Sequence, residues 1–375
     1  MIQPLSQSEV VAYLLNKNLI DPTDVCDSGL LVTDVSRRNC NVKVVVERGV
    51  SYLVKQCGEP NAIETLANEA VVYDMLYTDP RYRSLTDYLP RYYGYDSAKN
   101  LLILALLAGD AQDLEHYHAR GHFSKTIGRA VARGLAELHK VTISEQLGRS
   151  PGRRAVSDLP WVFTIHRPSL SQLRDLSAAS RQVVGILQRY PEFGDLIDAC
   201  AGNWRASSLI HGDVKWANFM VFAPNGSGRK TRLKIVDWEY AGLGDPCWDV
   251  GGALSAYISC WVLSMPMISA ATPIEWERLS RFPLEPMQPA MRAFWEAYAR
   301  HMSLDSLQRD SLLWRSTLFC AVRLVQTAIE RTQTVTVLSK NVVHLLQLAM
   351  NMLRRPVEAI VHVLGIDLKS DLVNA

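Results

Sequence analysis

The stretches HGDVKWAN (residues 211–218) and IVDWE (residues 235–239) decide how the rest of this chain is interpreted. The residues between them predict two strands joined by a Pro-Asn-Gly-Ser-Gly turn. Asn218 would begin the first strand and Asp237 would end the second, so the turn would bring their side chains next to each other. Asp213 is expected in the loop just before this hairpin.

These residue types suit phosphoryl transfer. Mg²⁺ prefers oxygen ligands, and the Asn218 amide and the Asp237 carboxylate supply them. Asp213 can then accept a proton from an attacking hydroxyl group. We therefore expect ATP and Mg²⁺ as cofactors, Asn218 and Asp237 as metal ligands, and Asp213 as the catalytic base.

The order of these motifs resembles the aminoglycoside phosphotransferase and choline kinase superfamily. Protein kinases place Arg where this chain has Gly212, and they follow the metal-binding Asp with Phe-Gly rather than with Trp238 and Glu239. GDPCWD (244–249) is similar to the superfamily's GDPxxD motif, in which the residue corresponding to Asp249 braces the catalytic loop. The resemblance implies a kinase-like fold and an alcohol group as phosphate acceptor.

The chain is expected to be α+β, with the bilobal fold of protein kinases. Residues 30–56 and 91–107 predict antiparallel strands that flank one helix, 62–77, and together they form a small lobe over residues 1–104. Residues 105–375 are mostly helical and form the larger catalytic and acceptor-binding lobe.

The resemblance also implies a lysine for the nucleotide phosphates and a glutamate that orients it. Lys55 ends a predicted strand and Glu69 lies on the following helix, in the family's order. Lys43 and Glu64 are alternative partners.

The predicted loop at residues 34–41 departs from the family pattern because it contains no glycine. Related enzymes often use glycine there so that backbone amides approach the phosphates. Ser36 and the guanidinium of Arg37 or Arg38 are the candidates to replace that contact, and we favour Arg38.

The composition of the chain limits the classes of partner and the cellular compartment that we expect. The net charge of +2, with basic residues spread along the chain, disfavours nucleic acid. Seven widely spaced cysteines favour a reducing cytoplasm. The uncharged segment 250–274 is interrupted by Pro266, which predicts a buried core helix rather than a membrane span.

Three features concern the acceptor. Residues 251–375 contain ten acidic and twelve basic side chains, which disfavours polycationic aminoglycosides. Lys215 stands where Ser/Thr protein kinases carry a lysine that stabilises the transferring phosphate. Segments 166–177, 248–267 and 354–366 resemble the phosphotransferases of class V lanthipeptide and thioamitide biosynthesis. That resemblance implies a peptide Ser or Thr as acceptor and a partner lyase that eliminates the phosphate.

Two alternatives stay open. One is a kinase of a small molecule such as an aminoglycoside, choline or a sugar. The other is a non-catalytic binding module with a kinase-like fold. The glycine-free loop favours the binding module, whereas the complete set of Asp213, Asn218 and Asp237 disfavours it.

Overall fold

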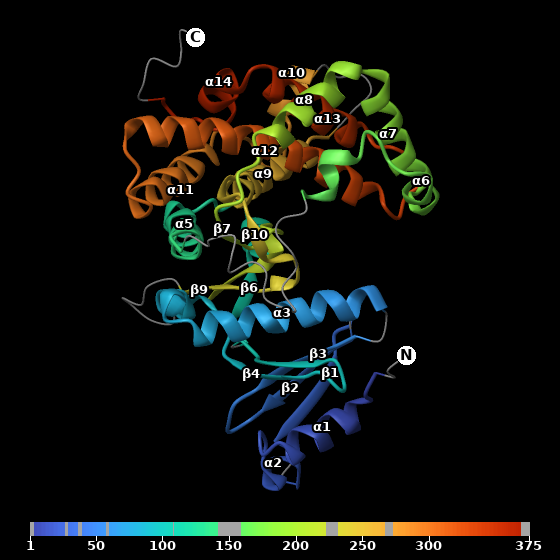
Figure 1. Ribbon diagram of the computed structural model, residues 1–375, viewed down its shortest axis with the longest axis vertical. Helices are drawn as coiled ribbons and strands as arrows, with labels where there is room; N and C mark the ends of the chain where they lie inside the picture. The colour runs from blue at the N-terminus through green and yellow to red at the C-terminus, as the bar shows by residue number, and fades with distance from the viewer. Residues whose placement is uncertain are drawn as a thin grey trace. The chain divides into compact units, whose positions relative to one another are not determined.

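The computed structural model describes residues 4–26, 29–36, 40–57, 60–107, 109–141, 159–222, 232–266 and 273–368 (Figure 1). It divides into two compact units. The first contains the described residues up to Leu114 together with Asn218–Ala241, and the second contains the remainder. The expected boundary after residue 104 therefore differs from the compact units, because residues 105–114 and 218–241 group with the first unit.

The first unit is built on a five-stranded antiparallel sheet in the order β1-β2-β3-β5-β4. The strands predicted from the sequence are present within a few residues of their expected bounds. They are β1 Leu30–Asp34, β2 Cys40–Val46, β3 Tyr52–Gln56, β4 Tyr92–Asp96 and β5 Leu101–Ala105. The long helix α3, Pro60–Thr78, connects β3 to β4 and contains the predicted helix.

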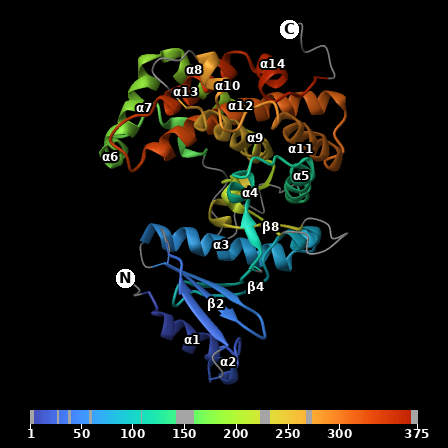
Figure 2. The same ribbon diagram turned by 180° about the vertical axis from the view of Figure 1, so that it is seen from behind.

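Helix α1, Gln7–Asn16, packs against this sheet (Figure 2). Ser6 and Glu9 form a capping box at its start, as their spacing predicts. Val10 and Leu14 of α1 are buried with Val44 of β2, which gives the unit an apolar core on that face of the sheet. The short helices α2, Pro22–Cys26, and η1, Pro80–Tyr88, complete the unit.

A three-stranded sheet explains why residues 218–241 belong to the first unit. β8, Phe219–Phe222, pairs with β9, Arg232–Ile235, as the predicted hairpin. β8 also pairs with β6, Ala111–Asp113, a strand too short to be predicted from its sequence pattern. Lys234 of β9 donates hydrogen bonds to the carbonyls of Asp87 and Leu89, which fixes the hairpin to η1. The short helix η5, Trp238–Tyr240, follows β9 and also belongs to the first unit.

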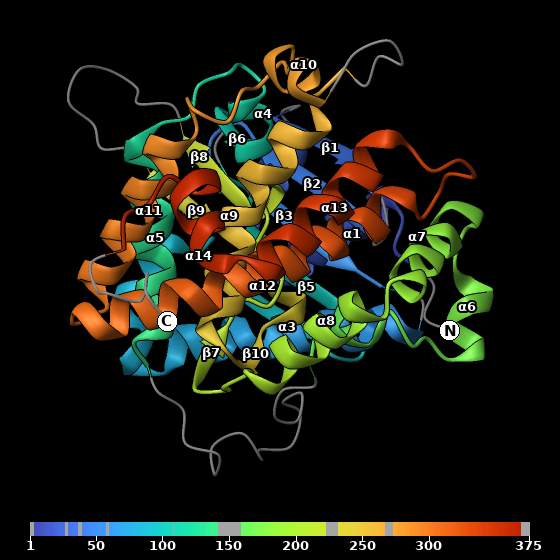
Figure 3. The same cartoon turned by 90° about the horizontal axis from the view of Figure 1, so that it is seen from above.

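The second unit is mostly helical, as predicted. Its elements in chain order are α4 Leu114–His118, α5 Lys125–His139, η3 Trp161–Thr164, α6 Leu170–Asp175, α7 Ala178–Arg189, α8 Pro191–Gly202, β7 Ser208–Ile210, η4 Trp216–Asn218, β10 Gly242–Gly244, α9 Pro246–Leu263, α10 Pro273–Arg278, α11 Gln288–His301, α12 Ser306–Thr332, α13 Lys340–Arg354, α14 Pro356–Glu358 and the π-helical turn η6 Ala359–Val363. Helix α12 packs against both α9 and α13, while α5 packs against α11 (Figure 3).

Two glycines let α9 approach its neighbours closely. A Cβ atom at Gly251 would lie 2.7 Å from the backbone nitrogen of Cys320 on α12. A Cβ atom at Gly252 would lie 2.8 Å from the carbonyl oxygen of Val214. Helix α9 contains residues 250–263 of the uncharged segment 250–274 and is buried along most of its length, as predicted for that part. Residues 267–272 of the segment lie outside the described residues. Within the described ranges, no helix is long and apolar enough to cross a membrane.

Candidate active site

The loop that carries Asp213 leaves the short strand β7, which pairs with β10. It is braced by Asp249, a fully buried residue in the first turn of α9. The two carboxylate oxygens of Asp249 accept hydrogen bonds from the backbone amides of His211, at 2.7 Å, and Gly212, at 3.0 Å. The Nε2 atom of His139 lies 3.1 Å from the same carboxylate. Asp249 therefore orients the loop through its backbone, which is the position that the sequence resemblance implied.

Gly212 takes a backbone conformation that favours glycine, with φ of 79°. Its carbonyl oxygen accepts a hydrogen bond of 2.9 Å from the indole nitrogen of Trp248. The loop is thus held on both its amide and its carbonyl side immediately before Asp213.

Asp213 is a buried carboxylate between two cations. Its Oδ2 atom lies 2.5 Å from Nζ of Lys215, and its Oδ1 atom lies 3.5 Å from the guanidinium of Arg323. Burial raises the pKa of Asp213, but the positive charges of Arg323 and Lys215 lower it by more than burial raises it. The pKa of Asp213 is therefore about 2. The side chain is therefore ionised at neutral pH and able to accept a hydrogen bond or a proton.

Sequence reasoning missed Arg323, which lies on α12 and is 5% exposed. Its guanidinium donates a 2.8 Å hydrogen bond to the carbonyl of Val214 and lies 5.2 Å from the centre of the Trp248 ring. A charged residue inside the apolar run FCAVRLVQ could have signalled it, since a buried guanidinium needs partners.

The first unit contains an arrangement with the opposite charges, in which a buried lysine lies between two carboxylates. Nζ of Lys55 lies 2.9 and 3.0 Å from the two oxygens of Glu69 and 3.0 Å from Oδ1 of Asp237. Burial lowers the pKa of Lys55, but these two carboxylates raise it above its usual value overall, so Lys55 stays protonated. The alternatives Lys43 and Glu64 are both exposed, and the structure joins Lys55 to Glu69.

Asp237 and Asn218 lie at the open end of the β8–β9 hairpin, as predicted. The backbone amide of Val236 donates a 3.0 Å hydrogen bond to the carbonyl of Asn218, which places the two predicted metal ligands at the same end. Asp237 has a left-handed backbone, with φ of 69°, a conformation rare for residues other than glycine and often found at functional sites.

The donor set at this end fits a hard cation. Asp237 offers a carboxylate and Asn218 an amide oxygen, and Glu69 and Glu239 add negative charge near Lys55. Among the described residues, no group of three His, Cys, Asp or Glu side chains could hold a metal by itself. Two protein ligands with waters and nucleotide phosphates are the usual environment of Mg²⁺.

The glycine-free loop is described only in part. The Ser36 hydroxyl accepts a 3.0 Å hydrogen bond from the amide of Asn41, and the Ser36 amide donates to Asp34. These contacts shape the turn between β1 and β2. Arg37 and Arg38 lie outside the described residues.

A pocket of about 620 Å³ opens beside the Asp213 loop within the second unit. We call it the acceptor-side pocket. It is lined by Glu115, Ala119, Val214, Lys215, Trp216, Ala217, Gly252, Ser255, Ala256, Ser259, Cys260, Leu263, Ser264, Arg281, Phe282, Arg323, Thr327, Glu330 and Arg331. Its volume is within the range of small-ligand sites.

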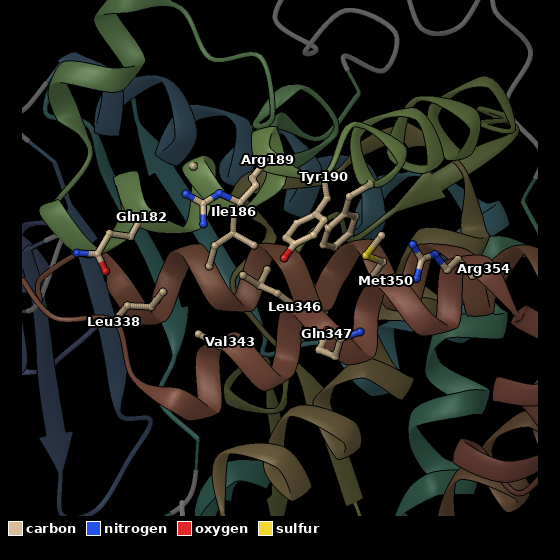
Figure 4. Close-up of a pocket in the computed structure, with 12 residues that line it drawn as sticks. Gln182, Ile186, Arg189, Tyr190, Leu338, Val343, Leu346, Gln347, Met350 and Arg354 are labelled. Atoms are coloured by element: carbon tan, nitrogen blue, oxygen red, sulfur yellow. The ribbon is translucent and has the colours of Figure 1, made fainter. Parts of the chain in front are cut away.

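A second pocket of about 560 Å³ lies between α7 and α13 (Figure 4). The side chains of Ile186, Tyr190, Leu346 and Met350 face it, and none of the described residues that line it is acidic, a histidine or a cysteine.

Comparison with known proteins gives a consistent result. A family model described as "Phosphotransferase enzyme family" matches residues 33–267, which is more than half of the chain. No curated protein matches the chain at a significant level.

Among solved structures, the chain is similar to the ADP-bound aminoglycoside phosphotransferase APH(2'')-Ib, with 17% identity, coverage of 93% of this chain and 99% of the other, and a TM-score of 0.50. It is also similar to a choline/ethanolamine kinase family protein from Mesorhizobium loti, with 15% identity, coverage of 95% of each chain and a TM-score of 0.47. The choline kinase LicA from Streptococcus pneumoniae has 15% identity, coverage of 93% of this chain and 99% of its own, and a TM-score of 0.47.

Proposed function

Because the chain belongs to the Phosphotransferase enzyme family, we propose that it transfers the γ-phosphate of ATP to a Ser or Thr hydroxyl of a peptide. The observation that carries this proposal is the ionised, buried carboxylate of Asp213 in a braced loop whose next residues line a pocket. A carboxylate so placed accepts a hydrogen bond from a hydroxyl that enters the pocket.

Asp213 is the proposed base. The acceptor oxygen attacks the γ-phosphorus, the bond from that phosphorus to the β,γ-bridging oxygen breaks, and ADP leaves with the electron pair. The proton of the hydroxyl passes to Asp213. Lys215, 2.5 Å from that carboxylate, supplies positive charge where the transferring phosphate is negative.

Lys55 is proposed to bind the α- and β-phosphates, with Glu69 fixing its ammonium group. Asn218 and Asp237 are the proposed ligands of Mg²⁺, which when bound neutralises phosphate charge. Ser36 and Arg38 are the proposed contacts of the nucleotide phosphates in the loop between β1 and β2.

The peptide acceptor is supported by the lysine at 215, by the near-neutral charge of residues 251–375 and by the resemblance to class V lanthipeptide and thioamitide enzymes. On this proposal the phosphopeptide is released to a partner lyase in the cytoplasm. Aminoglycosides, choline and sugars are the competing acceptors.

The direct test is a panel of acceptors. The protein would be incubated with MgATP and, separately, with Ser/Thr peptides, an aminoglycoside, choline and a hexose, and each acceptor examined by mass spectrometry for added phosphate. We expect the peptides to be phosphorylated. Efficient phosphorylation of a small molecule with no peptide modified would overturn the peptide acceptor and leave the kinase assignment intact. Tight MgATP binding without transfer to any acceptor would favour a binding module.

A further inference from the structure

The acceptor-side pocket has an uncharged floor. Helix α9 contributes small or apolar residues from one face: Gly252, Ser255, Ala256, Ser259, Cys260 and Leu263. Burial raises the pKa of the Cys260 thiol to about 12, so this side chain is also neutral. A ligand in the pocket therefore meets charge only at the Asp213 loop and at the walls.

The two carboxylates among the lining residues are already engaged. Glu115 lies 3.7 Å from Arg331, and Glu330 accepts a 2.8 Å hydrogen bond from Gln326. An ammonium-rich acceptor would have to compete with these partners. Four lining residues are basic, namely Lys215, Arg281, Arg323 and Arg331.

The four cations differ in their partners. Lys215 and Arg323 both contact Asp213, so these three side chains together carry one excess positive charge. Arg281 has a different environment. Within the described part of the chain its side chain contacts the carbonyl of Ala119, at 3.4 Å, and the ring of Phe282, at 4.9 Å, and neither partner is anionic.

We infer that the acceptor-side pocket selects a Ser or Thr with a negatively charged group beside it on the peptide, and that Arg281 binds that group. The inference rests on the proposed function and names the substrate class of the same site. An arginine that already lies against an aromatic ring and a carbonyl is partly pre-oriented to form a bidentate pair with a carboxylate. The anion is the side chain of Asp or Glu, or the phosphate of a residue modified in an earlier turnover.

The test uses fluorescently labelled peptides that differ at one position next to a central Ser. That position carries Glu, phosphoserine, Gln or Lys, and it is moved in turn along both sides of the Ser. Binding is measured by anisotropy in the absence of ATP, and phosphorylation is measured in parallel with MgATP. We expect Glu or phosphoserine at one position to improve binding about tenfold over Gln. The better of the two identifies the source of the charge.

Variants of the full-length protein assign the effect to one side chain. Arg281→Ala should abolish the preference, and Arg281→Glu should reverse it in favour of Lys. Arg278→Ala provides a matched control, because Arg278 is an exposed arginine of α10 that does not line the pocket. Thermal unfolding of each variant confirms that the fold is retained.

The outcomes separate this inference from the proposed function. Peptides that bind and are phosphorylated without regard to charge overturn the inference alone, as does a preference that survives in Arg281→Ala. Failure of every peptide to bind or to be phosphorylated overturns both. Loss of the preference in Arg281→Ala but not in Arg278→Ala supports the inference, whether or not turnover is fast.

Discussion

The two units hold their key charged residues in opposite ways. In the first unit one cation, Lys55, lies between the carboxylates of Glu69 and Asp237. In the second unit one carboxylate, Asp213, lies between the cations Lys215 and Arg323. Each group of three side chains therefore carries one excess charge, which is negative in the Lys55 group and positive in the Asp213 group. The first arrangement suits a metal ion that accompanies a nucleotide, and the second keeps the carboxylate of Asp213 ionised.

The difference predicts that changes in the first unit alter nucleotide binding, whereas changes around Asp213 alter turnover.

Replacement of Asp213 by Asn should reduce kcat by about 10²–10⁴-fold, because the amide cannot accept the proton of the acceptor. The affinity for MgATP should change less than about threefold. Steady-state rates at saturating acceptor and calorimetry with MgATP provide the two measurements. Asp195→Asn, at an exposed position on α8, is the control. Near-normal turnover in Asp213→Asn would remove Asp213 from the reaction.

Replacement of Asp237 by Ala should weaken MgATP binding by about 10–100-fold, comparable to the loss that follows damage to a metal site. Binding of ATP in the presence of a chelator should change much less, since the carboxylate acts through Mg²⁺. Titration with and without Mg²⁺ distinguishes the two. Equal affinity of variant and wild type under both conditions would show that Asp237 does not hold the metal.

Replacement of Glu69 by Gln should raise the KM for ATP about tenfold while kcat changes little. The variant loses one charged partner of Lys55, and a hydrogen bond to a charged group is worth about 1.5–3 kcal/mol. Glu64→Gln on the same helix is a matched control, because Glu64 is exposed. If both variants raised the KM equally, the Lys55–Glu69 pair would have no special role.

Replacement of Arg323 by Met should have the smallest effect at neutral pH, less than about tenfold in kcat. Its effect should increase in acid. Arg323 lowers the pKa of Asp213, which is about 2 in the wild type, so its loss raises that pKa and the ionised base is lost at a higher pH. The acidic limb of the kcat/KM profile should therefore move to higher pH, with Arg309→Met of the same helix as control. An unchanged limb would mean that another group controls it.

Much of this site was predictable because its residues lie in short motifs. Asp213, Asn218 and Asp237 occur in fixed order around one local hairpin, so strand pattern and spacing sufficed to place the last two together. The sequence alone left Lys43 as an alternative to Lys55, and the two are distinguished by the burial of their side chains in the structure. Lys43 lies on the exposed face of β2, between the buried Val42 and Val44.

The remainder depended on contacts between segments far apart in the chain. Arg323 reaches Asp213 from α12, and Arg315 pairs with the buried carboxylate of Asp245 at the start of α9. The spacing of apolar residues within one helix cannot predict such pairs, because the two partners lie in segments far apart in the chain. The strands β6, β7 and β10 were missed for a related reason, since three residues are too few to show alternation.

The close packing of α9 divides its residues into positions that cannot accept a larger side chain and positions that face a pocket. Gly251 and Gly252 have no room for a side chain, so the distance of α9 from α12 and from the Asp213 loop is fixed by backbone contact. Ser255, Ala256 and Ser259 line the pocket from the same helix and are free of that restriction. On the proposed function, larger residues there would change the size and polarity of the acceptor that fits, while Asp213 keeps its place. A new acceptor specificity could thus arise through single substitutions on one helix, with the machinery of phosphate transfer unaltered.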